Sequence, residues 1–277
     1  MRRRPAGWEP PGPVPPGDRG DPSLRRGPGE TLDCLSGHWK IFQLRRGHRY
    51  STDDLLTAWY AVEACRRAGV RPRRVLDLGC GIGSVGLLVL WKFPGAALVG
   101  VEAQAVSAGL ARRSVRYNGI EGRAEIRVGD FRDPGVFDAG ERFDLVTGSP
   151  PYLAPGEGRR SSLPQRGPCR FEDRGGARDY LRAASARLEA EGIVVWVHAT
   201  RYRHENVAAA VEAGLGRIAV RPVVFREGRK SLISLFWASQ GAAPARVEEE
   251  PALVVRGADG VWSDEYRRIR TEMGFPA

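Results

Sequence analysis

The stretch Ser149-Pro150-Pro151-Tyr152 combines two hydrogen-bond acceptors with an aromatic ring in four residues. The prolines restrict the backbone, so the Pro150 carbonyl has a defined direction. That carbonyl and the Ser149 hydroxyl can accept both hydrogens of an aromatic amine, while Tyr152 stacks on its ring. Such an amine is a poor nucleophile, and activating it depends on positioning and electrostatics rather than on a strong base. The alternative is an ordinary Pro-Pro loop with a packed tyrosine.

A glycine-rich loop precedes this stretch in the chain. Asp77, Gly79, Gly81 and Gly83 follow an apolar strand and open an apolar helix. Glycines let the backbone turn tightly and approach a ligand, but this is not the G-x-G-x-x-G spacing that cradles a pyrophosphate. The loop suits a methyl donor without pyrophosphate, S-adenosylmethionine (SAM), whose cationic amino group matches the acid at Asp77. The order of the two motifs predicts a SAM-dependent N-methyltransferase; the glycine loop alone could be an ordinary strand–helix turn.

Two more acids end predicted strands. Glu102, followed by Ala103, can accept hydrogen bonds from ribose hydroxyls, as in dinucleotide-binding folds. Asp130, followed by Phe131, can accept from the adenine amino group of the cofactor. An exposed strand-end acid and a turn-forming Asp are the competing interpretations. We assign Glu102, Ala103, Asp130 and Phe131 to the cofactor site.

A long loop over 153–175 follows the Pro-Pro stretch and is rich in Gly, Pro and Arg. Loops of this length inside a domain are usually functional or disordered. It would lie at the carboxyl edge of the sheet, where ligands bind. We expect its arginines to contact nucleic-acid phosphates, a solvated loop being the alternative. The residues assigned to this role are Arg159, Arg160, Arg166 and Arg170.

Strand and helix patterns alternate along the middle of the chain. This alternation predicts an α/β fold, a Rossmann-like, seven-stranded, mostly parallel sheet with helices on both faces and an antiparallel edge at its C-terminal end. We expect strands over 74–78, 97–102, 124–128, 143–147, 192–198, 217–226 and 231–238, and helices over 53–67, 84–91, 105–117, 177–189 and 203–213.

Four segments follow from composition and pattern. Residues 1–30 are rich in Pro, Gly and Arg, and we expect a disordered tail. Residues 31–70 should pack on the cofactor fold, and residues 71–240 should form the methyltransferase domain. Residues 241–277 should form a C-terminal extension with one strand and one helix, after a linker over 240–250.

The chain is strongly basic, with a formal net charge of +10 over 277 residues, which favours a polyanionic partner. Its four cysteines form no C-x-x-C pair, so neither a metal site nor a disulfide framework is expected, and a reducing cytoplasm fits. No apolar run is long enough to span a membrane. No dimerisation stripe is visible, and we expect a monomer.

The chain resembles the bacterial tRNA(valine) (adenine-N6)-methyltransferase family, within the class I SAM-dependent methyltransferases. The resemblance runs from about residue 33 to residue 277. It includes the segment 48–53 with its Tyr-Ser-Thr-Asp, the loop 75–83, the segment 100–104, Asn118-Gly119, the residues 164–172 and the tail around 253–257 with Tyr266. The cofactor motifs are common to many methyltransferases, and the combination with the loop and tail is more specific.

The resemblance implies methylation of adenine N6 beside the anticodon of a tRNA, with SAM as the donor. It also implies that Asp53 lies near the methionine end of the cofactor. The family usually has Asn where this chain has Ser149, and a hydroxyl is shorter than an amide and can donate as well as accept.

Other hypotheses stay open at this stage. The same N-methyl chemistry could act on DNA, on a protein glutamine or on a small molecule. The chain could also be a non-enzymatic RNA-binding module that keeps a methyltransferase fold, although its intact motifs argue against decay.

Overall fold

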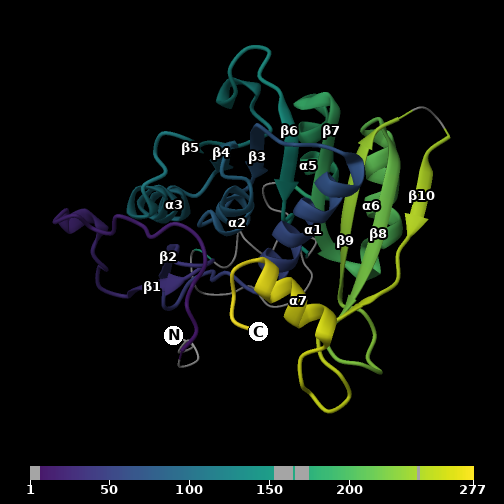
Figure 1. Cartoon of the computed structure of the whole chain (residues 1–277). Helices are drawn as coiled ribbons and strands as arrows, with labels where there is room; N and C mark the ends of the chain where they lie inside the picture. The colour runs from purple at the N-terminus through teal and green to yellow at the C-terminus, as the bar shows by residue number, and fades with distance from the viewer. Residues whose placement is uncertain (1–6, 153–164, 166–174, 242–243) are drawn as a thin grey trace.

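A central β-sheet runs through the molecule in the computed structural model, which describes residues 7–152, 165, 175–241 and 244–277 (Figure 1). Within these residues, nine strands form the sheet, with β11 (Leu253–Val254) pairing with β8 beside the order β10-β8-β9-β7-β6-β3-β4-β5. The other strands are β3 (Arg74–Leu78), β4 (Ala97–Glu102), β5 (Ala124–Val128), β6 (Phe143–Gly148), β7 (Leu188–Ala199), β8 (Leu215–Val224), β9 (Ile233–Gln240) and β10 (Arg246–Glu249). The predicted α/β Rossmann-like class is confirmed, with more strands than the seven expected.

The direction of the strands explains where a ligand can bind. Strands β3 to β7 pair in parallel, and β9 is antiparallel to both β7 and β8. The chain proceeds from β3 outward through β4 to β5, then returns to the other side of β3 as β6 and continues to β7. In open α/β sheets, the crevice at the carboxyl ends of the strands beside such a reversal is the usual ligand site. The fold therefore places its natural crevice between β3 and β6.

Alternate residues of the strands contribute to two hydrophobic cores, one on each face of the sheet. On one face, Val75 and Leu145 pack with α1 (Thr52–Ala68), α2 (Ser84–Lys92) and α3 (Ala105–Asn118). On the other face, Leu76 and Val146 pack with α5 (Ala177–Ala186) and α6 (Arg203–Glu212). Because successive side chains of a strand point to opposite faces, strands buried on both sides read as continuous apolar runs. The result is a three-layer arrangement.

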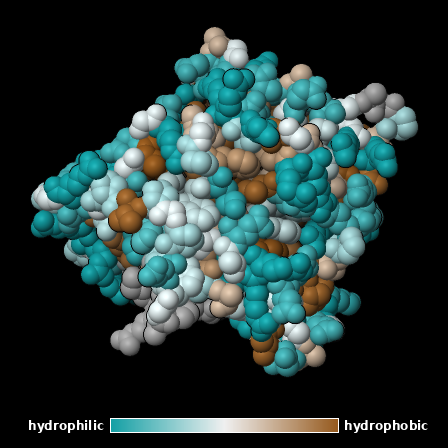
Figure 2. Space-filling model, in the orientation of Figure 1, coloured by the Kyte–Doolittle hydropathy of each residue, from teal (hydrophilic) through white to brown (hydrophobic). Residues whose placement is uncertain are grey.

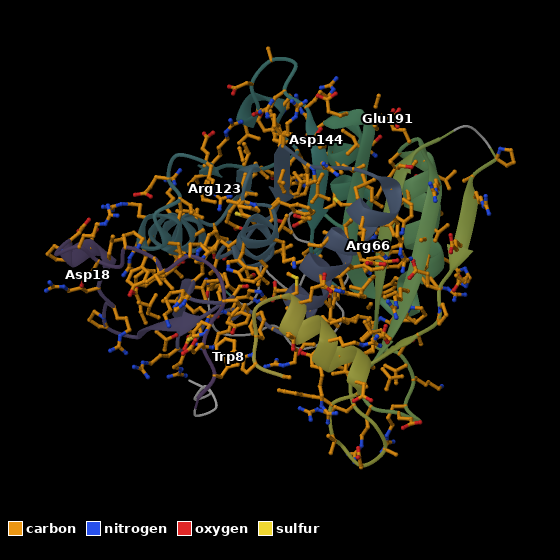
Figure 3. The ribbon with its side chains drawn as sticks, viewed as in Figure 1. Trp8, Asp18, Arg66, Arg123, Asp144 and Glu191 are labelled. Carbon is orange, nitrogen blue, oxygen red and sulfur yellow. The ribbon has the colours of Figure 1, made fainter. Side chains whose placement is uncertain are left out.

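The N-terminal segment differs from its expectation. Residues 7–30, predicted to be disordered, follow a defined path along α3 and include a short 3-10 helix, η1 (Pro22–Leu24). Arg113 of α3 donates to Glu30 at 2.7 Å and to the Ser23 carbonyl at 2.8 Å, and Arg116 pairs with Asp21. The segment lacks a core of its own, and contacts with a distant helix hold it in place. Residues 1–6 lie outside the described residues; Figure 3 labels Trp8 and Asp18 on the ordered part.

Two further differences concern the ends of elements. The predicted helix over 177–189 stops at Ala186, because Leu188 already pairs with Phe143 in the sheet. The predicted linker over 240–250 contains β10, which pairs in parallel with β8. All four residues of β10 are exposed, so the strand has no apolar signal in the sequence. The helix α7 (Asp264–Glu272) closes the chain and packs Tyr266 and Ile269 into the first core.

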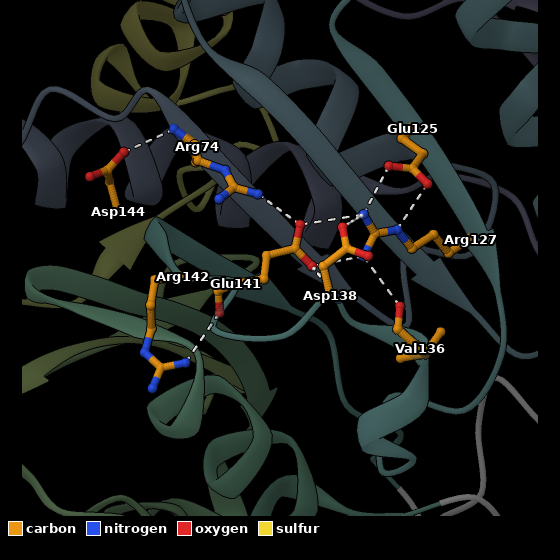
Figure 4. A network of polar contacts seen from close by, with 8 residues as sticks. All are labelled: Arg74, Glu125, Arg127, Val136, Asp138, Glu141, Arg142 and Asp144. Carbon is orange, nitrogen blue, oxygen red and sulfur yellow. Dashed lines mark hydrogen bonds and ion pairs between the residues drawn. The ribbon is translucent and has the colours of Figure 1, made fainter.

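Two smaller features frame the sheet. The strands β1 (Glu30–Cys34) and β2 (Lys40–Leu44) form an antiparallel hairpin that packs on α3. A polar network around buried Glu141 joins β3 to β5: guanidinium nitrogens of Arg74 and Arg127 each lie 2.7 Å from a carboxylate oxygen of Glu141 (Figure 4).

Hydrophilic residues cover most of the face seen in Figure 2. No helix in the described part of the chain has the length and apolar character needed to cross a membrane.

Candidate active site

A cavity of about 410 Å³ opens at the carboxyl ends of β3, β4 and β6, where the fold predicts a ligand site. Its wall contains twelve of the thirteen residues assigned from the sequence to the cofactor and the target amine. They are Asp53, Asp77, Gly79, Gly81, Glu102, Ala103, Asp130, Phe131, Ser149, Pro150, Pro151 and Tyr152. The exception is Gly83, which caps the start of α2 at φ +85° and packs beside Ala111 and Leu87. The structure thus brings together residues from five separate stretches of chain.

Two glycines of the loop leave space for different groups: Gly81 faces the cavity, and Gly79 faces the side chain of Tyr180. Gly81 has φ +57° and lines the cavity, and a side chain built there would meet open space within 4 Å. Gly79 has φ +60°, and a side chain there would collide with the Tyr180 hydroxyl. Both backbones are in the left-handed region that favours glycine. Gly81 is therefore free to approach a bound molecule, while Gly79 makes room for Tyr180.

Asp77 lies beneath the glycine loop, and both of its carboxylate oxygens accept hydrogen bonds from other elements of the fold. Its carboxylate accepts from the Thr147 hydroxyl at 2.8 Å and from the Gly86 amide at 3.0 Å. Burial raises the pKa of Asp77 to about 7, against these two hydrogen bonds, which lower it. Asp77 therefore ties β3 to β6 and to α2 in addition to lining the cavity.

Glu102 fixes the far side of the loop. One of its oxygens accepts from the Gly81 amide at 2.9 Å, and the other accepts from the Gln104 amide at 2.7 Å. A carboxylate oxygen has more than one lone pair, so both can still accept from a diol. Asp130 forms an ion pair with Arg132 at 2.5 Å, beside Phe131. The Phe131 ring in turn contacts Tyr180, with 4.4 Å between ring centroids.

Two adjacent acids, Asp53 and Asp54, lie in the first turn of α1 at the cavity wall. Asp54 completes a capping box by accepting from the Ser51 amide at 2.7 Å, and it also accepts from the Ser84 hydroxyl at 2.9 Å. Among the described residues, Asp53 accepts one side-chain bond, from the Tyr152 hydroxyl at 3.3 Å. Burial and then the neighbouring Asp54 charge raise the pKa of Asp53 to about 6. A carboxylate at this position suits a cationic group of a ligand.

The Pro-Pro stretch is held from beneath by His198. The Nε2 atom of His198 donates to the Pro151 carbonyl at 3.0 Å, and since a carbonyl only accepts, Nε2 carries the proton. The His198 ring also meets Tyr152, with 5.4 Å between centroids. Burial lowers the pKa of His198, which favours the neutral ring. The prolines, His198 and the ring of Tyr152 form one packed unit at the end of β6.

Gln165, the one residue between 153 and 174 that the structure describes, bonds to two segments beside the site. Its side-chain oxygen accepts from the His48 amide at 2.8 Å, and its nitrogen donates to the Ser107 hydroxyl at 3.0 Å. His48 lines the cavity. The four arginines assigned to phosphate contact, Arg159, Arg160, Arg166 and Arg170, lie outside the described residues.

Sequence reasoning missed several residues of this site. Asp54, Ser84, Tyr180 and His198 reach it from segments far apart in the chain. Asp54 carried a readable signal, because Ser-x-x-Asp before an apolar run resembles a capping box. The others carried none. Within the part of the chain that the structure describes, no three His, Cys, Asp or Glu side chains gather as a metal site.

The sequence resembles methyltransferases of several kinds. A family model described as "Methyltransferase small domain" matches residues 62–163. A "tRNA1(Val) (adenine(37)-N6)-methyltransferase" of Porphyromonas gingivalis strain W83 is 28% identical over 232 residues, which are 80% of this chain and 86% of that protein. A "Release factor glutamine methyltransferase" of Rhodospirillum rubrum is 35% identical over 138 residues, 47% of this chain and 39% of that protein.

The fold is similar to that of a solved structure. The crystal structure of a "predicted O-methyltransferase" from Agrobacterium tumefaciens superposes with a TM-score of 0.62 at 20% identity. The match covers 81% of this chain and 98% of that one. At this level of identity the likeness concerns the fold alone.

Proposed function

Since this chain is a SAM-dependent methyltransferase with a class I, Rossmann-like fold, we propose that it methylates the exocyclic N6 of an adenine in RNA, specifically in a tRNA. The observation that carries the proposal is the meeting of two motifs in one cavity. Ser149, Pro150 and Tyr152 line the same cavity as Gly81 and Glu102. A planar amine held at the first set therefore lies next to a methyl donor held at the second.

The residues of the cavity fit SAM part by part. The acid of Asp53 suits the ammonium of its methionine portion, and Glu102 suits the two ribose hydroxyls. Phe131 supplies an apolar surface for the adenine ring, with Asp130 as an acceptor for the adenine amine. When bound, SAM supplies an electrophilic methyl group on a sulfonium.

The chain's own residues then act on the target by position. Ser149 Oγ and the Pro150 carbonyl accept the two amine hydrogens, which directs the nitrogen lone pair out of the ring plane. The Tyr152 ring stacks on the base, and His198 keeps the Pro-Pro backbone fixed. The target base must leave its stack to enter the cavity, which an unpaired loop nucleotide does at low cost. The alignment of the amine with the methyl donor and the fixed dipoles of the site accelerate methyl transfer, and no strong general base is needed.

The choice of tRNA rests on the relatives and on charge. A relative that matches 80% of this chain is named as a tRNA adenine-N6-methyltransferase. The net charge of +10 suits a polyanionic substrate. A second candidate, methylation of a glutamine amide in a protein, is favoured by the shorter match to a release factor methyltransferase.

One experiment separates the two candidates. Purified protein is incubated with SAM carrying a labelled methyl group and with three pools: unmodified total tRNA, genomic DNA and nuclease-treated protein extract. We expect N6-methyladenosine in the tRNA pool, identified by mass. Label only in DNA, or only in the nuclease-treated extract, would overturn the proposed substrate while leaving the methyl donor in place.

A further inference from the structure

A second cavity, of about 910 Å³, adjoins the first across the beginning of α1. Ser51 lines both cavities. The next residues divide between them: Asp53 and Asp54 line the first, while Thr52 and Leu55 line the second. A polymer bound in one cavity can therefore continue into the other around a single turn of helix.

Aromatic rings and guanidinium groups form much of the wall of this second cavity. Two arginines lie near the Trp262 ring, with the guanidinium carbon of Arg270 at 4.0 Å and that of Arg256 at 5.5 Å from its centroid. Arg270 also lies 5.5 Å from the Phe275 ring centroid. Tyr50 adds a further ring beside Ser51. Stacked aromatic and guanidinium planes are the surfaces on which unpaired bases bind.

The charge of this wall is positive. Arg49 is neutralised by Asp33, at 2.8 Å. Arg256 and Arg270 instead donate to backbone carbonyls, those of Gly260 and Pro276. Neither forms an ion pair among the described residues, although the carboxyl end of the chain at Ala277 lines the same cavity. Two guanidinium groups without carboxylate partners are well suited to phosphate, which they can bind through two parallel hydrogen bonds.

We propose that the second cavity binds an unpaired nucleotide that neighbours the target adenine in the RNA, with its base on the Arg270–Trp262 layer and its phosphate at Arg256 and Arg270. This inference rests on the proposed function and adds a subsite to it. A nucleotide neighbouring a flipped base is pulled from its stack together with it, and the shared Ser51 wall gives the backbone a short route. The volume is in the range of natural ligand sites.

The test compares two arginines of the same helix. Arg270→Gln removes a charge at the cavity, and Arg268→Gln removes the same charge from an exposed position of α7 that does not line it. Steady-state kinetics with unmodified tRNA should show KM raised about tenfold for Arg270→Gln, at unchanged kcat, and little change for Arg268→Gln. The slope of log KM against log salt should fall by about one for Arg270→Gln only. SAM affinity, measured by calorimetry, should stay at the wild-type value in both. Arg270→Gln loses contacts with Trp262 and Pro276, so its melting temperature is measured as well and should remain well above the assay temperature.

A second set of measurements keeps the test independent of one variant. Arg256→Gln should repeat the result for Arg270→Gln. A short RNA with an abasic residue beside the target adenine should be a poorer substrate for the wild type, and Arg270→Gln should lose less with this RNA than the wild type does. Equal KM values for all three variants, in a protein that methylates tRNA, would overturn the second cavity as a subsite.

Two other outcomes have separate meanings. If the wild type forms no N6-methyladenosine in any RNA, the proposed function fails before the subsite is tested. If label enters only nuclease-treated extract and Arg270→Gln abolishes it, the cavity binds a protein segment, and the nucleotide assignment is wrong.

Discussion

The hydroxyl of Tyr152 lies 3.3 Å from a carboxylate oxygen of Asp53, joining the end of β6 to the first turn of α1. This bond connects the two halves of the proposed reaction, since Tyr152 is assigned to the target base and Asp53 to the methionine end of SAM. Burial and the Asp53 charge raise the pKa of Tyr152 well above its usual value, so the phenol stays protonated and donates. The two residues are therefore directly coupled through this hydrogen bond.

Two substitutions of Tyr152 should separate the contribution of its ring to methyl transfer from that of its hydroxyl. Tyr152→Phe keeps the ring for stacking, and we expect methyl transfer within about tenfold of wild type. Tyr152→Ala should lower kcat/KM by about 100-fold, because base stacking contributes roughly 1–3 kcal/mol. SAM affinity should change little in either variant. An equal loss of SAM affinity and of transfer in Tyr152→Ala would place the ring in the cofactor part of the cavity instead.

Binding of SAM should release a proton near pH 6. Asp53 has its pKa raised to about 6 in the folded chain, so it is partly protonated there, and a bound ammonium would favour its charged form. SAM should therefore bind more tightly as pH rises, by up to about tenfold per pH unit below pH 6. Calorimetry in buffers of different ionisation enthalpy measures the released proton directly.

The Asp53→Asn variant is the control for that titration. It keeps the shape of the side chain, removes the charge, and should abolish the pH dependence near 6 while weakening SAM. A pH dependence that persists in Asp53→Asn would assign it to another group, of which Asp77, with a pKa raised to about 7, is the nearest candidate.

Substitution of Asp77 should lower stability as well as SAM affinity. Both oxygens accept hydrogen bonds, from Thr147 and from Gly86, so the amide nitrogen of Asp77→Asn would face a donor. An unsatisfied buried donor costs about 1–3 kcal/mol in the free energy of unfolding. Denaturant unfolding without ligand should show this loss. Unchanged stability with weakened SAM binding would mean that Asp77 serves the ligand alone.

His198 should act as a positioning residue for the Pro-Pro stretch. His198→Leu removes the donor to the Pro151 carbonyl, and we expect kcat to fall about tenfold at unchanged SAM affinity. His198→Gln keeps a donor and should recover part of the loss, which a role in packing alone would not explain. Because burial lowers the pKa of His198 in the folded state, its contribution to stability is present above about pH 6.5 and is lost as pH falls. The acid limb of the stability profile should flatten in both variants.

The sequence predicted the parts of the fold that depend on local pattern. Parallel strands buried on both faces read as apolar runs, and their carboxyl ends meet at one edge, so Asp77, Glu102 and Ser149 could be expected together. The contacts of His198 and Tyr180 could not, because they depend on how β7 and α5 pack against loops far away in the chain. The order of residues 7–30 is another such case, since Arg113 and Arg116 hold the segment from α3. Exposed β10 has no apolar pattern and is detected only through its pairing with β8.

Ser149 offers the sharpest test of the target amine, because the family that the sequence resembles is expected to have Asn here in most members. The Ser149 hydroxyl reaches less far from the backbone than an amide oxygen would. If the target is adenine N6, Ser149→Asn should retain or raise kcat on tRNA, and Ser149→Ala should lower it about tenfold by removing one acceptor. Labelled-methyl transfer to the same tRNA pool measures all three proteins. Loss of activity in Ser149→Asn equal to that in Ser149→Ala would mean that the site is shaped for a different amine, and the glutamine and DNA pools would then be compared for the variant and the wild type.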